Sequence, residues 1–159
     1  MAAKTSAGIL MFRRKAQNIE VLLVHPGGPF FRTKDAGAWT IPKGEVGEGE
    51  ELLERAKIEF KEELGVDCTS DCIELGSIKQ KGGKTVHAWA VESSLPDEFV
   101  LKSNTFLLEW PPRSGRKQEF PEVDSAEFFP LAKARIKINQ AQIPLLDRLV
   151  AIIGEQPND

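Results

Sequence analysis

The sequence predicts one α/β (α+β) domain over residues 1–159, in which a mixed sheet lies between helices. Short apolar runs typical of strands outnumber the amphipathic helical stretches, and the two kinds are interspersed along the chain. No internal repeat, low-complexity tract or linker divides the sequence, and 159 residues are enough to bury one hydrophobic core. A disordered, fibrous or multidomain architecture is therefore not expected.

The charge composition argues against two classes of partner. The chain has 21 Lys and Arg against 24 Asp and Glu, so its net charge is −3, which disfavours bulk binding to duplex nucleic acid or to an anionic membrane. No apolar run approaches the ~20 residues that span a bilayer, and the run at residues 7–12, stopped by Arg13 and Arg14, indicates a strand rather than a signal peptide. Cys68 and Cys72 are too few for a disulfide framework, so we expect free thiols in the cytoplasm.

The first part of the chain predicts a hairpin followed by a loop. Residues 7–12 and 19–25 are apolar runs separated by a polar stretch, which is typical of a β-hairpin. The Pro-Gly-Gly-Pro sequence at 26–29 ends the second strand. A brief strand-like piece follows at residues 39–41, and a glycine-rich loop begins after Pro42.

Residues 50–64 predict an amphipathic helix. Its apolar residues recur on one stripe of the helical wheel: Leu53, Ala56, Phe60 and Leu64. Gly65 follows directly, where a left-handed residue commonly ends a helix.

The second half predicts more strands and a final helix. The strands are expected at residues 73–78, 84–91, 106–110 and 127–129, with a polar loop at 111–121. An apolar stripe predicts a helix at residues 143–153, which Gly154 is expected to stop.

Three glutamates crowd one face near the end of the first helix. At about 100° per residue, Glu59, Glu62 and Glu63 share an arc of roughly 100° that is largely separate from the apolar stripe. Arg55 lies in the same arc, one turn earlier. The like charges repel one another, and the helix dipole disfavours anions near the C-terminus. Two interpretations follow: a solvated acidic face, or a cluster of hard oxygen ligands for Mg²⁺ or Mn²⁺.

The loop before this helix favours the second interpretation. Gly44, Gly47 and Gly49 let the backbone approach a ligand closely. Lys43, at the start of the loop, is a natural partner for a phosphate group.

Residues 44–66 resemble the Nudix box. The fixed glycines and glutamates of that family pattern match here at Gly44, Glu50, Glu59, Glu62, Glu63 and Gly65. Ile58 departs from the pattern, because the family has Arg at this position. Residues 39–45 also resemble the Trp-x-x-Pro-Lys-Gly-Glu lead-in common in the family, and the order of strands around the box is compatible with a Nudix-like α/β/α sandwich.

The resemblance implies a single Nudix hydrolase domain that uses Mg²⁺ or Mn²⁺ to cleave a pyrophosphate bond in a nucleoside diphosphate linked to another moiety. It implies that Glu59, Glu62 and Glu63 are metal ligands, together with the Gly44 carbonyl. Such ions would neutralise the pyrophosphate and polarise its phosphorus, so the resemblance gives Glu59 and Glu62 a catalytic role.

Family members often take a further catalytic base from a loop well after the box. Residues 122–131 resemble the Glu-x-x-x-x-x-Trp-x-x-Leu stretch common in the family, with Phe128 in place of Trp, and this favours Glu122. Glu119 is the alternative base. Either carboxylate would otherwise serve only to solubilise a loop.

Four residues are candidates for binding the substrate. Lys43, Arg113 and Arg116 would suit a polyphosphate tail, and Trp39 would stack on a base, although an ordinary solvated loop and a core position for Trp39 stay open. The lead-in favours a nucleoside triphosphate or dinucleoside polyphosphate over a sugar nucleotide. We expect a small-molecule nucleotide as the partner, and a homodimer is left open.

Ile58 decides between an enzyme and a binding module. In the family, the Arg at this position holds the glutamates of the box. Arg55 can substitute for it in part, and so belongs with the catalytic residues, because Arg55 and Glu59 form an i, i+4 pair. The alternative is a Nudix-fold module that binds nucleotide and turns over slowly or not at all. The intact glutamates favour an enzyme.

Overall fold

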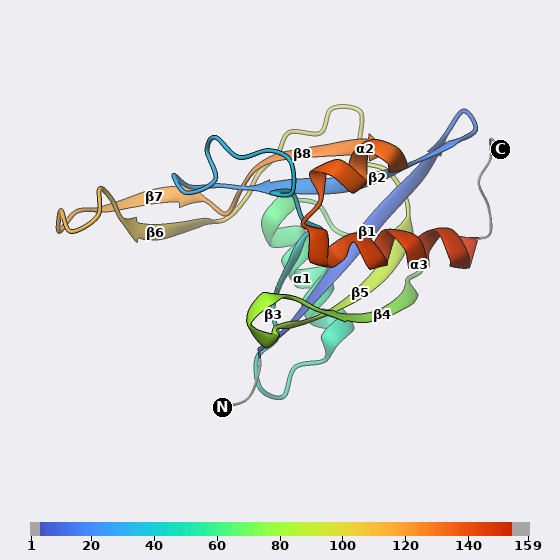
Figure 1. The fold of residues 1–159 in the computed structure, drawn as a ribbon, viewed down its shortest axis with the longest axis horizontal. Coiled ribbons are helices and arrows are strands. Elements are labelled where there is room, and N and C mark those ends of the chain that lie inside the picture. The colour runs from blue at the N-terminus through green and yellow to red at the C-terminus, as the bar shows by residue number, and fades with distance from the viewer. Residues whose placement is uncertain (1–3, 154–159) are drawn as a thin grey trace.

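A six-stranded mixed sheet runs through the centre of the computed structural model, which describes residues 4–153 (Figure 1). Its strands are β1 (Thr5–Lys15), β2 (Asn18–Pro26), β3 (Lys43–Glu45), β4 (Ile73–Lys79), β5 (Thr85–Glu92) and β8 (Val123–Pro130). Their order is β4-β5-β1-β2-β8, with β3 paired to β1. Among these strands β1 and β5 pair in parallel and the other pairs are antiparallel, so the sheet is mixed as predicted.

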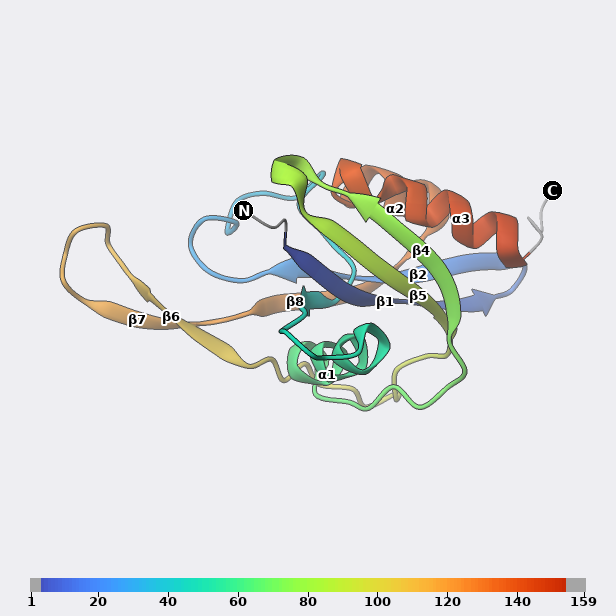
Figure 2. The same cartoon turned by 90° about the horizontal axis from the view of Figure 1, so that it is seen from below.

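Helices cover both faces of this sheet. Helix α1 (Leu52–Leu64) lies on one face, and α2 (Leu131–Lys137) and α3 (Ile143–Ile153) lie on the other (Figure 2). Successive β1 side chains point to opposite faces, so Ile9 packs in the core beneath α1 and Leu10 in the core beneath α3. The predicted α/β class is confirmed. Among the helices of the described part of the chain, none is long and apolar enough to cross a membrane.

Helix α1 ends where the sequence predicts and begins two residues later. It starts at Leu52 rather than Glu50. Gly65 follows it with φ 83°, and its N–H donates to the Lys61 carbonyl at 2.7 Å, which is the left-handed cap that glycine adopts at low cost.

Two of the strands are displaced from their predicted positions. Residues 39–41 make only isolated bridges, and the paired strand is β3, held against β1 where Gly8 leaves room for the chain. The last strand, β8, begins at Val123 and is longer than the predicted 127–129. Its early residues, Val-Asp-Ser-Ala, are mostly polar or small, so no apolar run marks them as a strand.

One strand and one α-helix were not predicted at all, besides two short 3₁₀ helices at Lys81–Gly83 and Gln140–Gln142. The supposed polar loop at 111–121 contains β7 (Lys117–Pro121), which pairs with β6 (Thr105–Glu109) although most of its side chains are exposed. Helix α2 was missed because Ala134 is its only buried residue, which is too little for an apolar stripe. Gly154, the predicted stop of the last helix, lies outside the described residues.

Strands β6 and β7 form a hairpin, here called the arm (residues 105–121), which projects from the body of the molecule (Figures 1 and 2). The loop at residues 27–37 contacts it, because the Phe30 and Trp110 rings meet edge to face with centroids 5.5 Å apart. No arm residue belongs to either hydrophobic core of the described structure.

Candidate active site

An arginine on α1 joins that helix to the loop before it. Arg55 Nη1 donates to Glu59 Oε2 at 3.0 Å, and Arg55 Nη2 and Nε donate to the Glu50 carboxylate at 2.5 and 3.1 Å. Glu50 Oε1 also accepts the Gly47 N–H. The hydrogen bonds to Glu50 and Glu59 raise the pKa of Arg55. Arg55 thus supplies a fixed cation to the glutamates, whereas Ile58 is exposed on the same helix.

Gly44 lies directly against the Glu59 side chain. A Cβ atom built on Gly44 would lie 2.0 Å from Glu59 Cδ, so a side chain at position 44 would displace the Glu59 carboxylate. Pairing with Ala7 of β1 holds Gly44 in place. The backbone of one candidate ligand therefore touches the carboxylate of another.

Glu63 is a buried acid on the same helix. It is only 8% exposed. Burial, followed by the negative charges of Glu59 and Glu122, raises the pKa of Glu63 to about 8. The ammonium of Lys43 opposes this shift, although burial also lowers the pKa of Lys43. A buried carboxylate with acidic neighbours is unfavourable unless a cation compensates for it.

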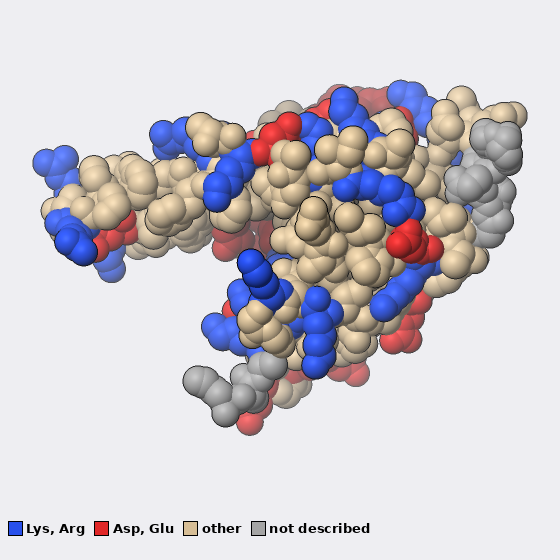
Figure 3. Space-filling model, viewed as in Figure 1, with Lys and Arg blue, Asp and Glu red and all other residues tan. Residues whose placement is uncertain are grey.

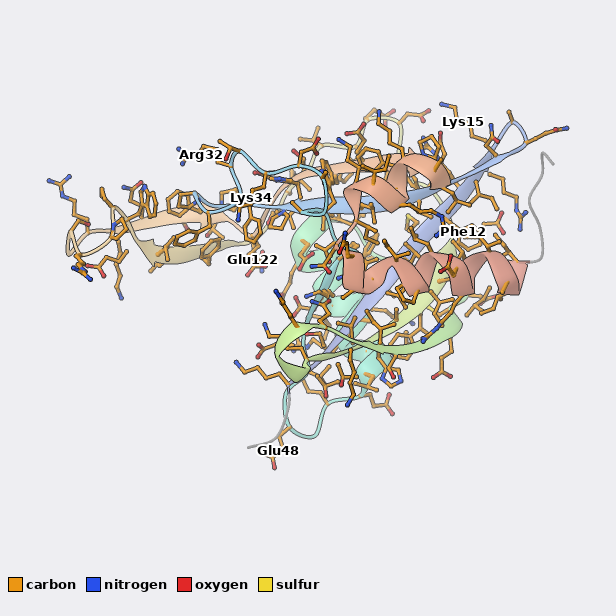
Figure 4. All side chains as sticks on the ribbon, in the orientation of Figure 1. Phe12, Lys15, Arg32, Lys34, Glu48 and Glu122 are labelled. Carbon is orange, nitrogen blue, oxygen red and sulfur yellow. The ribbon has the colours of Figure 1, made fainter. Side chains whose placement is uncertain are left out.

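Glu122 joins this cluster from the start of β8, where the arm meets the body (Figure 4). Burial and then the charge of Glu62 raise the pKa of Glu122. Asn104 connects the two segments through its backbone: its N–H donates to the Glu62 carbonyl at 2.8 Å, and its carbonyl accepts the Glu122 N–H at 2.8 Å. Ser103 Oγ donates to the Asn104 carbonyl at 2.7 Å and accepts the Val123 N–H at 3.0 Å. Ser103 and Asn104, here called the seam, therefore fix Glu122 relative to α1.

The donor atoms of this cluster suit a hard divalent cation. They are the carboxylates of Glu59, Glu62, Glu63 and Glu122 and the carbonyl of Gly44, and Mg²⁺ and Mn²⁺ prefer such oxygens. Burial also raises the pKa of Glu59 and outweighs the opposing hydrogen bond from Arg55, and the charge of Glu62 adds a smaller increase. Within residues 4–153, no three His, Cys, Asp or Glu side chains already stand in a preassembled metal site. The residues fit a divalent metal by their chemistry and by the mutual repulsion that it would relieve.

Trp39 lies in the core rather than in the glutamate cluster. It is 7% exposed, and its indole N–H donates to Asp35 Oδ1 at 2.8 Å. Its ring meets the Phe129 ring edge to face, with centroids 5.0 Å apart. The structure therefore gives Trp39 the core position that the sequence left open.

The remaining candidates lie on the arm. Arg113 and Arg116 are in the turn between β6 and β7, at its outer end and far from α1 (Figures 1 and 2). Glu119, the alternative base, is exposed on β7 and accepts a hydrogen bond from Thr105 Oγ1 at 2.5 Å. Lys43, Gly44, Arg55 and the four clustered glutamates come together, and these three arm residues do not join them.

The seam leaves no signal in the amino-acid sequence. Two of its four hydrogen bonds join backbone groups only, and such groups leave no trace in residue identity. The pairing of Phe30 with Trp110 also leaves no signal in the sequence. Their pairing depends on how the loop at 27–37 meets the arm, which no periodicity reveals.

The fold and the glutamate-bearing helix define the class of protein. The NUDIX domain family model matches residues 3–149, and this chain belongs to the Nudix family. Hydrolases of this family generally use divalent metal ions.

Among known proteins, the asymmetrical bis(5'-nucleosyl)-tetraphosphatase of Caenorhabditis elegans is 31% identical over 111 residues, which are 66% of this chain and 76% of that protein. The structure of a C. elegans Ap4A hydrolase binary complex is 25% identical with a TM-score of 0.65, and the match covers 95% of this chain and 98% of that chain. The NUDIX domain of Shewanella oneidensis NrtR, complexed with ADP ribose, shows the same fold at 15% identity, with a TM-score of 0.68 over 96% of this chain and 90% of that chain. The family and the hydrolase relative identify a Nudix-type pyrophosphohydrolase that acts on nucleotides.

Proposed function

We propose that this enzyme hydrolyses a pyrophosphate bond of nucleoside triphosphates or dinucleoside polyphosphates, with Mg²⁺ or Mn²⁺ held by the glutamate cluster. The observation that carries the proposal is that Glu122 lies beside the carboxylates of α1. Asn104 joins the backbones of Glu62 and Glu122, and the charge of Glu122 adds to the effect of burial in raising the pKa values of Glu59 and Glu63. The C. elegans relative, a tetraphosphatase by name, makes dinucleoside polyphosphates the first substrates to test.

Each residue has a separate task in this proposal. Glu59, Glu62, Glu63 and the Gly44 carbonyl hold the metal, and Arg55 orients Glu59. Bound metal supplies charge neutralisation at the pyrophosphate and polarises its phosphorus. The Lys43 ammonium binds a phosphate oxygen.

Glu122 is the proposed general base. Its pKa is raised toward neutral, which improves a carboxylate as an acceptor of the proton from an attacking water molecule. The seam fixes its backbone relative to Glu62. Glu119 stays the alternative base, although its carboxylate bonds Thr105 on the arm.

Phosphate release with purified protein tests the proposal. The substrates are nucleoside triphosphates, dinucleoside polyphosphates, ADP-ribose and sugar nucleotides, each with Mg²⁺, Mn²⁺ or EDTA. We expect metal-dependent release that falls by about 100-fold in Glu122→Gln, the range typical of a lost general base, and by a similar factor in Glu62→Gln, which loses a metal ligand. Glu54→Gln, on an exposed position in the first turn of α1, is the matched control and keeps full activity. Equal activity in all three variants refutes the residue assignment.

The same screen decides the role of Ile58. Metal-dependent nucleotide binding without turnover of any substrate would mean that Arg55 does not replace the missing Arg. We expect turnover, because Arg55 already bonds Glu59 and Glu50.

The compartment and the oligomeric state are separate proposals. We infer a cytoplasmic location from the two free thiols, Cys68 and Cys72. Small nucleotides are the proposed partners, and sedimentation of the purified chain tests whether it forms a homodimer.

A further inference from the structure

We propose that the arm and the loop beside it form a second nucleoside-binding site, in which Phe30 and Trp110 stack on the distal base of a dinucleoside polyphosphate. This inference rests on the proposed function and extends it, because it assigns where the part of the substrate beyond the cleaved bond binds.

Phe30 and Trp110 form an aromatic pair in which Phe30 is exposed and Trp110 is half-buried. The two rings lie at 83° to each other with centroids 5.5 Å apart. Phe30 is 59% exposed, which is the largest exposure of any Phe or Trp in residues 4–153. Flat aromatic faces that remain accessible are the surfaces on which nucleobases stack, and such stacking tolerates any base.

Close backbone contacts fix the loop that carries Phe30 to the catalytic segment. The Gly27 N–H donates to the Glu122 carbonyl at 3.0 Å, and a Cβ on Gly27 would lie 2.0 Å from the Pro121 carbonyl oxygen. Gly28 has φ +97° and passes close to the Phe106 ring. The aromatic pair and Glu122 therefore belong to one connected unit, and the position of the pair relative to the glutamates is defined.

Cations lie on both elements that carry the aromatic pair. Arg32 and Lys34 are on the loop (Figure 4), and Arg113, Arg116 and Lys117 are at the outer end of the arm, where Figure 3 shows a group of basic side chains. Among residues 4–153, none of these five side chains forms a salt bridge. Unpaired cations beside an aromatic pair suit a ligand that combines phosphates with a base.

The distance between the aromatic pair and the glutamate cluster favours a substrate with two nucleosides. Trp110 follows Thr105 by five residues, so at about 3.4 Å per residue its backbone lies roughly 17 Å along the strand from the base of the arm. Thr105 pairs with Pro121, next to Glu122. Several phosphates and a second ribose cover such a distance, whereas a nucleotide with one base cannot occupy both ends.

Kinetics with two substrates test this inference. The probes are a dinucleoside tetraphosphate and the corresponding nucleoside triphosphate, and the readout is the ratio of their kcat/KM values. We expect Phe30→Ala to lower this ratio about tenfold, through KM for the dinucleotide, since stacking on one aromatic ring contributes at this level. Phe30→Trp restores the ratio because it keeps an aromatic face.

Leu107→Ala is the matched control. Leu107 is an arm residue that is 65% exposed, and strand alternation places it on the opposite face of β6 from Phe106. We expect it to leave the ratio unchanged. An equal loss on both substrates in Phe30→Ala, or no loss on either, overturns the inference.

Calorimetric titration with the same two nucleotides, in buffer without divalent metal, separates this inference from the proposed function. We expect Phe30→Ala to remove the tighter binding of the dinucleotide. If the wild-type protein hydrolyses neither nucleotide, the proposed function fails while the titration still decides the second site. Equal affinities of the wild type for both nucleotides reject the site.

Discussion

Gly44 and Glu59 make the closest fit between two residues of the site. A Cβ at position 44 would overlap the Glu59 carboxylate, which is the mobile end of a side chain and can move away. We therefore expect Gly44→Ala to displace Glu59 and to lower kcat at least about tenfold, because misplaced catalytic groups lose rate steeply. The melting temperature should change little. Steady-state kinetics and thermal unfolding of the same preparation check this prediction.

Glu48 supplies the control for this substitution. It is exposed in the same loop and points away from the cluster (Figure 4). Glu48→Ala should keep wild-type kcat. Full activity in Gly44→Ala would show that the contact with Glu59 has no catalytic role.

The buried carboxyl of Glu63 makes stability depend on pH. Its folded-state pKa of about 8 lies above the ordinary value of 4.5, so the folded protein disfavours the ionised form and loses stability as pH rises from about 4.5 through 8. Gln cannot ionise. In EDTA, we expect Glu63→Gln to exceed the wild-type free energy of unfolding by roughly 1–3 kcal/mol at pH 8.5 and to match it near pH 4.5.

Urea unfolding at both pH values measures this difference. Glu54→Gln, at an exposed position on the same helix, should differ little from wild type at either pH. A stabilisation by Glu63→Gln that is the same at both pH values would contradict the electrostatic cause.

At the scale of elements, the seam joins helix α1 to strand β8. Ser103 Oγ bonds both the Asn104 carbonyl and the Val123 N–H, on either side of Glu122. Ser103→Ala removes both bonds, so Glu122 is held less firmly, and we expect kcat to fall about tenfold with a smaller change in KM. Ser103→Thr keeps the hydroxyl and should restore kcat.

A control variant separates positioning from general loosening. Ser94→Ala removes a hydroxyl that bonds Arg13 instead, and it should leave kcat unchanged. A fall in stability without a change in kcat for Ser103→Ala would assign the seam a structural role only.

The elements also show which features a sequence can predict. Helix α1 was predicted because an apolar stripe and Gly65 both mark it, and the structure confirms its C-terminal end. Strand β7 was not predicted, because its composition is polar. It is a strand because it pairs with β6. The active site likewise contains residues that a sequence pattern marks and contacts that it does not. The glutamates of α1 follow from a motif, whereas the seam depends on backbone contacts between distant segments.

At the scale of the whole molecule, the arm is an addition to a complete fold. None of its residues belongs to the two cores that flank the sheet. Asn-Gly is a favoured two-residue hairpin turn, and in place of residues 108–118 it would connect Leu107 to Glu119, its partner in the β6–β7 register. We expect the melting temperature to stay within about 5 °C of wild type, because little apolar area is lost.

Differential scanning calorimetry of the shortened chain measures its melting temperature. The deletion removes Trp110, so the preference for dinucleotides should be lost with it, while phosphate release from a nucleoside triphosphate continues. A fall in melting temperature well beyond that range would show that the arm supports the body of the molecule.

The backbone bonds of Asn104 have a consequence for how this protein tolerates mutation. Position 104 lends only its peptide N–H and carbonyl to the link between α1 and β8, and its side chain is exposed. Nineteen of the twenty amino acids carry that N–H, and proline alone lacks it. Most substitutions of Asn104 should therefore leave the enzyme's chemistry unchanged, whereas Asn104→Pro would remove the hydrogen bond to the Glu62 carbonyl.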